Sequence, residues 1–181
     1  VITDVNTGDV LAMVSYPGYD NNKMANTVDA EYYAQLNADK SSPQLNFATQ
    51  YKAAPGSTFK IVSATAGLLE NVINLQSRVN CVGTFTEITP SPRCWKISGH
   101  GYENVTSAIK DSCNYFFYNV GYQLATRTGS YNEEAGLDTL SKYADLYGLT
   151  DKSGVEIGEY APDVSTKDPV RSAIGQGSNS Y

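Results

Sequence analysis

The pattern of apolar and polar residues predicts a mixture of short strands and helices in the first third of the chain. Residues 2–5, which begin and end with an apolar side chain, and the apolar-rich residues 10–16 flank a polar turn, which predicts a β-hairpin. Residues 29–37 predict a short helix with Asp29 near its N-terminus. The break Pro55-Gly56 precedes a stretch from Phe59 to Leu69 that is apolar on nearly every side, so we expect a buried central helix there.

The rest of the chain predicts a long loop followed by helices. Gly, Pro, Ser and Thr dominate residues 74–103, which indicates a loop with room for one short hairpin. Helical periodicity returns at 105–110, 114–125 and 132–147, with Gly148 as a C-cap, and loop and turn are expected beyond it. The residues expected to face inward are Phe116, Phe117, Val120, Leu124, Leu137, Leu140, Tyr143, Ala144 and Tyr147.

Length and charge narrow the class of protein. The 181 residues suit one domain, and 41% hydrophobic residues favour a folded chain. A net charge of -6 without a basic stripe argues against a nucleic-acid partner. The sequence holds no apolar run of membrane-spanning length and no signal peptide. Val1 reads as mid-strand and Tyr181 follows a Gly-rich turn, so we expect residues 1–181 to be a single partial domain of a longer protein.

Ser57 and Lys60 form a candidate nucleophile and activating base. A serine hydroxyl needs a neighbouring base near neutral pH, and a spacing of three residues places both side chains on one helix face. Burial lowers the pKa of a lysine, and the positive end of the helix dipole favours charge on the serine oxygen. The alternative is a first-turn serine that only caps the helix, since this spacing also occurs by chance.

A second polar motif, Ser112-Cys113-Asn114, falls between two predicted helices. A serine and an asparagine at such a junction can point a hydroxyl and an amide into a cleft, where they would relay a proton and hold a substrate amide or the lysine. The alternative is an N-cap with local hydrogen bonds.

These motifs together resemble the transpeptidase domain of penicillin-binding proteins, class B members most closely. Ser57-Thr58-Phe59-Lys60 and Ser112-Cys113-Asn114 are similar to the Ser-x-x-Lys and Ser-x-Asn motifs of that family. The opening hairpin around Thr7-Gly8-Asp9, the triplet Gly99-His100-Gly101, and Ile174-Gly175-Gln176-Gly177 also resemble class B landmarks, in the same order along the chain.

The resemblance implies an α+β fold in which a helical lobe lies beside a mainly antiparallel sheet, with the active site between them. It implies that Ser57 attacks the D-alanyl-D-alanine end of a peptidoglycan stem peptide and passes the acyl group to an amine. Lys60 would be the base, while Ser112 and Asn114 would relay a proton and position substrate. β-Lactams would trap Ser57. The resemblance further implies no cofactor for catalysis, an anchor in the bacterial membrane facing outside, and cell-wall synthesis membrane proteins as partners.

The third motif of the family, Lys-Thr-Gly, does not follow at the expected distance. Lys152-Ser153-Gly154 is chemically close, but it precedes Ile174-Gly175-Gln176-Gly177, whereas the family's third motif follows that landmark. We therefore reject it and expect a domain truncated at its C-terminus. Because the missing strand supplies part of the oxyanion hole, we expect this chain alone to be inactive.

Cys81, Cys94, His100 and Cys113 are the cysteines and the histidine of the chain. The first three lie between the two motifs, and Cys113 is the middle residue of the second motif. Three thiolates and an imidazole suit a closed tetrahedral zinc site, which would tie the long loop to the junction at Ser112. Two alternatives are a Cys81–Cys94 disulfide, which an extracytoplasmic location would permit, and three reduced, inert thiols.

Three other functions are compatible with the motifs. A serine β-lactamase or D,D-carboxypeptidase would hydrolyse the acyl-enzyme, and no residue stands out as a base for that water. A β-lactam-binding sensor would couple acylation to a membrane signal. A stable fold without activity is the third.

Overall fold

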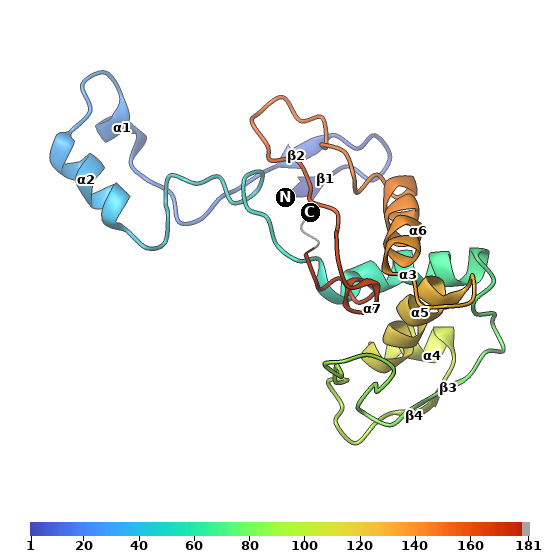
Figure 1. Cartoon of the computed structure of the whole chain (residues 1–181). Helices are drawn as coiled ribbons and strands as arrows, with labels where there is room; N and C mark the ends of the chain where they lie inside the picture. Colours follow the sequence, from blue (N-terminus) through green and yellow to red (C-terminus); the bar gives the residue numbers. More distant parts are fainter. Residues whose placement is uncertain (179–181) are drawn as a thin grey trace. The chain divides into compact units, whose positions relative to one another are not determined.

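The computed structural model describes residues 1–178 and divides into two compact units (Figure 1). The first comprises residues 1–51 and 154–160, and the second comprises residues 52–153 and 161–181. The elements of the first unit are β1 (Ile2–Thr3), β2 (Val10–Ala12), α1 (Asn21–Met24) and α2 (Ala30–Ala38).

The predicted hairpin and first helix are both confirmed. β1 and β2 pair antiparallel, with Ile2 opposite Ala12, although both strands are shorter than predicted. Asp29 caps α2, because its carboxylate accepts hydrogen bonds from the backbone N–H groups of Glu31 and Tyr32 at 3.0 and 3.1 Å. The short helix α1 was not predicted.

The second unit holds a helical cluster and one strand pair. Its elements are α3 (Lys60–Leu69), β3 (Val79–Cys81), β4 (Gly101–Glu103), α4 (Val105–Lys110), α5 (Asn114–Thr126), α6 (Glu133–Leu146) and α7 (Pro169–Ser172). The four longer predicted helices are confirmed to within a few residues at each end. β3 and β4 pair antiparallel and so close the two ends of the predicted long loop, with Cys81 opposite Gly101. α7 falls where loop and turn were expected.

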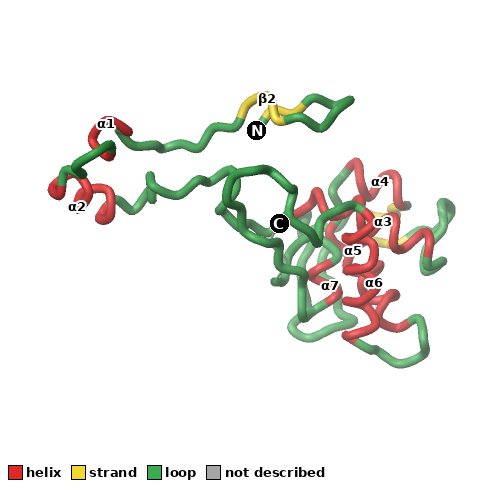
Figure 2. The backbone as a smooth tube through the Cα atoms, turned by 90° about the horizontal axis from the view of Figure 1, so that it is seen from above, coloured by secondary structure: helices red, strands yellow, loops and turns green. Residues whose placement is uncertain are grey.

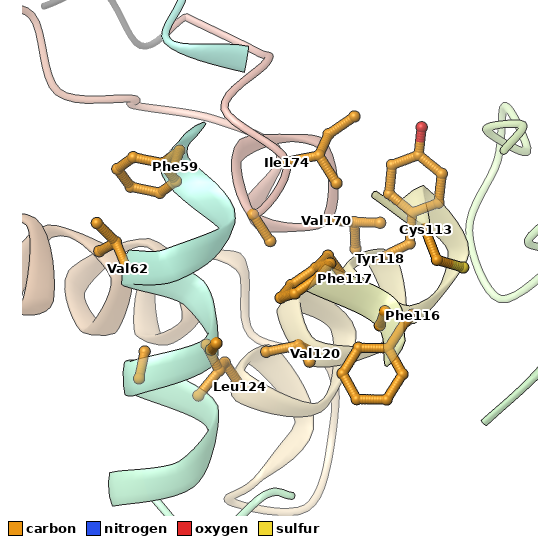
Figure 3. Close-up of a cluster of buried hydrophobic side chains, with 14 of the residues drawn as sticks. Phe59, Val62, Cys113, Phe116, Phe117, Tyr118, Val120, Leu124, Val170 and Ile174 are labelled. Carbon is orange, nitrogen blue, oxygen red and sulfur yellow. The ribbon is translucent and has the colours of Figure 1, made fainter. Parts of the chain in front are cut away.

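α5 packs against α3, α6 and α7 in the second unit (Figure 2). Its apolar side chains lie in the buried cluster of this unit (Figure 3). Phe116, Phe117, Val120 and Leu124 are fully buried, as predicted. Burying an apolar side chain of this size stabilises the fold by about 1.5–3 kcal/mol. The site residues Lys60 and Asn114 therefore begin two helices that share one core.

Two expectations about inward faces were wrong. α3 was expected to be buried all round, but Ile61 and Leu69 are 46% and 63% exposed, so only one side of the helix enters the core. Tyr147 was expected to face inward, but it is 48% exposed. α6 ends at Leu146, so the helical period no longer directs Tyr147 to the core. Its hydroxyl instead lies 2.9 Å from the hydroxyl of Thr65.

Glu70, at the end of α3, ties three elements of the helical cluster together. Its carboxylate accepts hydrogen bonds from Lys142 at 2.8 Å and from the Tyr143 hydroxyl at 3.0 Å, and it forms an ion pair with Arg127. The hydrogen bonds from Lys142 and Tyr143 hold the pKa of Glu70 below its usual range.

The mixed α+β class is confirmed, with antiparallel pairing in both two-stranded sheets of the described residues. Over residues 1–178, no helix combines the length and hydrophobicity needed to cross a membrane. That residues 1–181 form one partial domain stays a prediction.

Candidate active site

Ser57 lies in a 3-10 turn, Gly56–Phe59, that runs directly into α3. The sequence placed it in the first turn of the α-helix itself, whereas α3 begins at Lys60. Phe59 anchors the turn in the core at 3% exposure, while Ser57 is exposed. The residues in the cap positions of the turn and of α3 are Pro55 and Phe59, so Ser57 is not a cap. Its hydroxyl is presented at the surface by a turn whose last residue is buried in the core.

The segment around Gly175 packs against the backbone just before Ser57. The N–H of Gly56 donates to the carbonyl oxygen of Gly175 at 2.9 Å, and the Ser63 hydroxyl donates to the carbonyl of Ala173 at 2.7 Å. Gly175 has φ +71°, and a Cβ built there would lie 2.0 Å from the carbonyl oxygen of Gly56. Only glycine permits this approach, which fixes the entry to the nucleophile turn.

Lys60 is buried, with 2% of its surface exposed, and its ammonium group is fully hydrogen-bonded. Nζ donates to the Ser112 carbonyl oxygen at 2.8 Å, to the Ser112 hydroxyl at 3.0 Å and to Oδ1 of Asn114 at 2.6 Å. A charged lysine has three N–H donors, and each has one acceptor here. The structure thus brings together Lys60 and both outer residues of the Ser112-Cys113-Asn114 motif.

Ser112 bridges the lysine and the candidate nucleophile. Its hydroxyl donates to the Ser57 hydroxyl oxygen at 3.0 Å and also accepts from Lys60. The sequence placed Ser57 and Lys60 in direct reach of each other, whereas the hydrogen bonds of the described residues connect them through Ser112. Hydroxyl groups can rotate, so the chain Ser57–Ser112–Lys60 can carry a proton from the first residue to the last.

Ser112 sits in a strained backbone position that glycine normally occupies. The N–H of Ser112 bonds to the carbonyl of Ile109 at 3.1 Å, and the N–H of Cys113 bonds to that of Ala108 at 2.9 Å. This pair of bonds is the Schellman motif that ends α4, and its left-handed position is Ser112, with φ 49°. Since α5 has Cys113 at its N-cap position, Ser112 is not an N-cap. Strained backbone positions of this kind are common at functional sites, and the Ser112 hydroxyl is part of this one.

The environment of Lys60 makes its neutral form accessible. Burial lowers the pKa of Lys60 to about 8, although the nearby Cys113 and Cys94 sulfurs act in the opposite direction. A lysine with this pKa exists partly as the free amine near neutral pH. It can therefore accept a proton without a further base.

Cys81, Cys94, His100 and Cys113 converge beside this network, and their ligand atoms all lie within 4.8 Å of one another. Nδ1 of His100 lies 3.5 Å from the Cys81 sulfur and 3.6 Å from the Cys94 sulfur. Zn–S bonds of about 2.3 Å and Zn–N bonds of about 2.0–2.1 Å at a tetrahedral angle place these atoms about 3.6 Å apart. The spacing therefore fits a tetrahedral metal ion, and the three cysteines are free thiols.

The backbone around the cluster is folded to bring these ligands together. Gly99 has φ +80°, and a Cβ there would lie 2.1 Å from the Cys81 carbonyl oxygen, so only glycine allows the two segments to meet. Burial opposes ionisation of Cys94, but backbone N–H groups of Tyr115, Lys96 and Asn114 outweigh it and lower the pKa of its thiol. Burial raises the pKa of Cys113.

Trp95 is a residue of the site that the sequence did not single out. Its indole N–H donates to the carbonyl oxygens of Asp111 and Ser112 at 3.2 and 3.1 Å. Two signals were available, because Trp95 is the single tryptophan of the chain and directly follows Cys94. Lys152 and Ser153 lie in the loop after α6 and not on a strand, which agrees with rejecting them as the third motif.

A family model described as the penicillin binding protein transpeptidase domain matches residues 1–180 of the chain. Among curated proteins, the peptidoglycan D,D-transpeptidase MrdA of Escherichia coli K12 is 33% identical over 162 residues. That match covers 88% of this chain and 24% of MrdA, so the chain spans about a quarter of the length of this relative.

Solved structures show the same similarity. Penicillin-binding protein PBP2 of Helicobacter pylori, in complex with MreC, matches with a TM-score of 0.81 at 25% identity, covering 92% of this chain and 32% of that one. Penicillin-binding protein A of M. tuberculosis, as a penicillin G acyl-enzyme complex, matches with a TM-score of 0.76 at 26% identity. The latter match covers 96% of this chain and 40% of the other.

Proposed function

Because the chain belongs to the transpeptidase-domain family of class B penicillin-binding proteins, we propose that it carries the acyl-transfer centre of a peptidoglycan D,D-transpeptidase. The observation that carries the proposal is the hydrogen-bond chain from Ser57 through Ser112 to the buried Lys60, with Asn114 as a further acceptor. Such a chain supplies what a serine nucleophile lacks, a base within reach.

The reaction would begin with transfer of the Ser57 proton through the Ser112 hydroxyl to neutral Lys60. The Ser57 oxygen then bonds to the carbonyl carbon of the penultimate D-alanine of a stem peptide. The C–N bond to the terminal D-alanine breaks, and that residue leaves as an amine after taking the proton back from Lys60. An amine of a neighbouring stem peptide attacks the ester carbonyl carbon and loses a proton to Lys60. The C–O bond to Ser57 breaks, and Lys60 returns that proton to the Ser57 oxygen through Ser112, so both residues are unchanged after one cycle.

Asn114 has a separate role in this proposal. Its Oδ1 accepts the shortest of the three Lys60 hydrogen bonds, at 2.6 Å, which holds the amine beside Ser112. Its amide N–H₂ group has two N–H donors, so beside its interaction with the Tyr118 side chain it can donate to a substrate carbonyl. Asn114 would thus position both the base and the peptide.

β-Lactams would be acylating substrates of the same serine. The penicillin G acyl-enzyme structure of the M. tuberculosis relative supports this assignment. The test is the lifetime of the adduct in the longest natural protein that contains this chain. A transpeptidase keeps the penicilloyl group for many minutes, whereas rapid hydrolysis of the drug with no persistent adduct would identify a serine β-lactamase and contradict the proposal.

No cofactor enters this reaction, but we propose that Cys81, Cys94, His100 and Cys113 hold a structural zinc ion. The support is geometric: four buried or half-buried ligand atoms at tetrahedral spacing, in a mixture of thiols and imidazole that zinc prefers. A bound zinc ion would link β3 and the loop between β3 and β4 to Cys113, the residue immediately before α5. Its contribution would therefore be to stability and not to chemistry.

Metal analysis of the purified protein tests this site. We expect about one zinc per chain and slow reaction of the cysteines with a thiol reagent until a chelator is added. Cys81→Ser should lose the metal, whereas Ser41→Ala, on an exposed turn, should keep it. Metal-free protein with three rapidly reacting thiols would contradict the proposal.

We also propose that the chain works on the outer face of the bacterial membrane with cell-wall synthesis membrane proteins as partners. The support is that the H. pylori relative was solved together with MreC. Affinity purification from membranes, with identification of co-purified membrane proteins, tests this part. Recovery of the protein in the cytoplasmic fraction alone would contradict it.

A further inference from the structure

Trp95 links the cysteine–histidine cluster to the candidate catalytic network. Its neighbour in the sequence is Cys94, and its ring lies edge-on to the His100 ring, with centroids 5.0 Å apart. On its other side, its indole N–H reaches the carbonyl oxygen of Ser112 at 3.1 Å. The Trp95 side chain thus contacts both the cysteine–histidine cluster and the candidate catalytic network.

The carbonyl oxygen that accepts a hydrogen bond from the Trp95 indole also accepts one from the candidate base, Lys60. The Ser112 carbonyl oxygen accepts from Lys60 Nζ at 2.8 Å and from Trp95, so the two donors share its two lone pairs. The indole also contacts the Asp111 carbonyl at 3.2 Å. Asp111 and Ser112 are the first two residues after α4, so their carbonyl groups have no partner within that helix.

The position of Trp95 is difficult to explain by packing alone. Trp95 is 62% exposed, so most of its ring contributes nothing to the core. By contrast, the peptide plane that it contacts belongs to Ser112, whose φ of 49° is strained and must be held by its surroundings. A rotation of the Ser112–Cys113 peptide would move the Ser112 carbonyl away from Lys60. A change of φ at Ser112 relative to the Asp111–Ser112 peptide would turn the bridging hydroxyl away from Ser57. The indole N–H contacts the carbonyl oxygens of both peptides.

We propose that Trp95 is a positioning residue for acyl transfer, whose indole N–H fixes the Ser112 peptide and thereby the Ser57–Ser112–Lys60 relay. This inference rests on the proposed acylation of Ser57. Loss of the indole N–H leaves the relay residues in place but lets the Ser112 peptide rotate, so the acylation step slows. Binding of the drug before acylation does not depend on this hydrogen bond and stays unchanged.

The test measures penicillin acylation in the longest natural protein that contains this chain, at several drug concentrations. This separates the maximal acylation rate from the dissociation constant of the non-covalent complex. Trp95→Phe removes the N–H but keeps an aromatic ring, and Trp95→Ala removes both. Tyr102→Phe is the matched control, because Tyr102 is also an exposed aromatic residue, 71% exposed, in the neighbouring strand β4.

We expect Trp95→Phe and Trp95→Ala to lower the maximal acylation rate to a similar extent, about tenfold, with unchanged dissociation constants and unchanged active-site counts. Tyr102→Phe should match the wild type. A Phe variant that acylates at the wild-type rate while the Ala variant is slow would overturn the role of the N–H. A loss of active-site count at an unchanged rate would show a merely structural role. Failure of the wild type itself to acylate would overturn the proposed function, and this inference with it.

Discussion

Ser112 is well suited to a mutational test because its backbone conformation favours one residue type and its side-chain role requires another. Its φ of 49° favours glycine, whereas the relay between Lys60 and Ser57 requires the hydroxyl. We compare Ser112→Ala with Ser112→Gly. Both lose the hydroxyl and leave Lys60 with one acceptor fewer, so this cost cancels between them.

The difference between the two variants isolates the backbone strain. A left-handed conformation costs a residue with a Cβ about 1–2 kcal/mol. Glycine avoids this cost but gives the unfolded chain about 0.4–1 kcal/mol of additional entropy. The glycine variant should therefore be more stable than the alanine variant by about 1 kcal/mol, which raises the melting temperature by about 2–4 °C for a domain of this size.

The assay combines thermal unfolding with penicillin acylation. Both variants should acylate about 100- to 10,000-fold more slowly than the wild type, because each lacks the relay hydroxyl. An alanine variant that melts at or above the temperature of the glycine variant would refute the strain argument. Acylation near the wild-type rate in either variant would refute the relay.

Other predictions concern the base, the nucleophile turn and the helical cluster. The pKa of Lys60 is lowered to about 8, and acylation needs the neutral amine. The acylation rate should therefore rise with pH through this value and then level off. A rate that does not depend on pH in this range would contradict the role of Lys60 as base. Gly175→Ala should destabilise the protein by about 2 kcal/mol more than Gly148→Ala, measured by urea unfolding, because both glycines have a φ near +70° but a Cβ at Gly148 meets nothing within 4 Å. Equal losses would show that the contact with Gly56 can relax. Glu70→Ala should cost about 1–3 kcal/mol in the same assay, since it leaves Lys142 and Tyr143 without their acceptor, whereas the exposed Asp138→Ala should change little.

Elements with strong local signals could be predicted from the sequence almost to the residue. α4 was expected at 105–110 and is found there, because Asn104 and Ser107 form a capping box at its start and the Schellman motif ends it. α5 was predicted from the spacing of its apolar residues, which also form its buried face. In both cases, information within a few residues decides the structure.

Elements that depend on distant partners could not be predicted in this way. β3 and β4 pair across the whole predicted loop, so neither strand has a local turn signal. α7 has four residues and is set by its packing on α5, where a Cβ at Gly121 would lie 2.5 Å from the Pro169 carbonyl oxygen. Short elements of this kind depend on tertiary packing more than on propensity.

The residues of the site were visible in the sequence, but their connections were not. Spacing alone suggested that Lys60 reaches Ser57 directly, whereas in the structure Ser112 lies between them. Which acceptor an amine selects depends on the strained turn at Ser112, whose geometry is not visible in the motif. Trp95 escaped attention because exposed aromatic residues in polar loops are common and carry no motif.

The proposed function depends on Ser57 as the acylated nucleophile. The most direct measurement is mass spectrometry with peptide mapping after incubation of the longest natural protein that contains this chain with a labelled penicillin, beside the Ser57→Ala and Thr58→Ala variants. We expect one stable adduct on the peptide that holds Ser57 in the wild type and in Thr58→Ala, and none in Ser57→Ala. An adduct that persists in Ser57→Ala, or intact drug with unmodified wild-type protein, would contradict it.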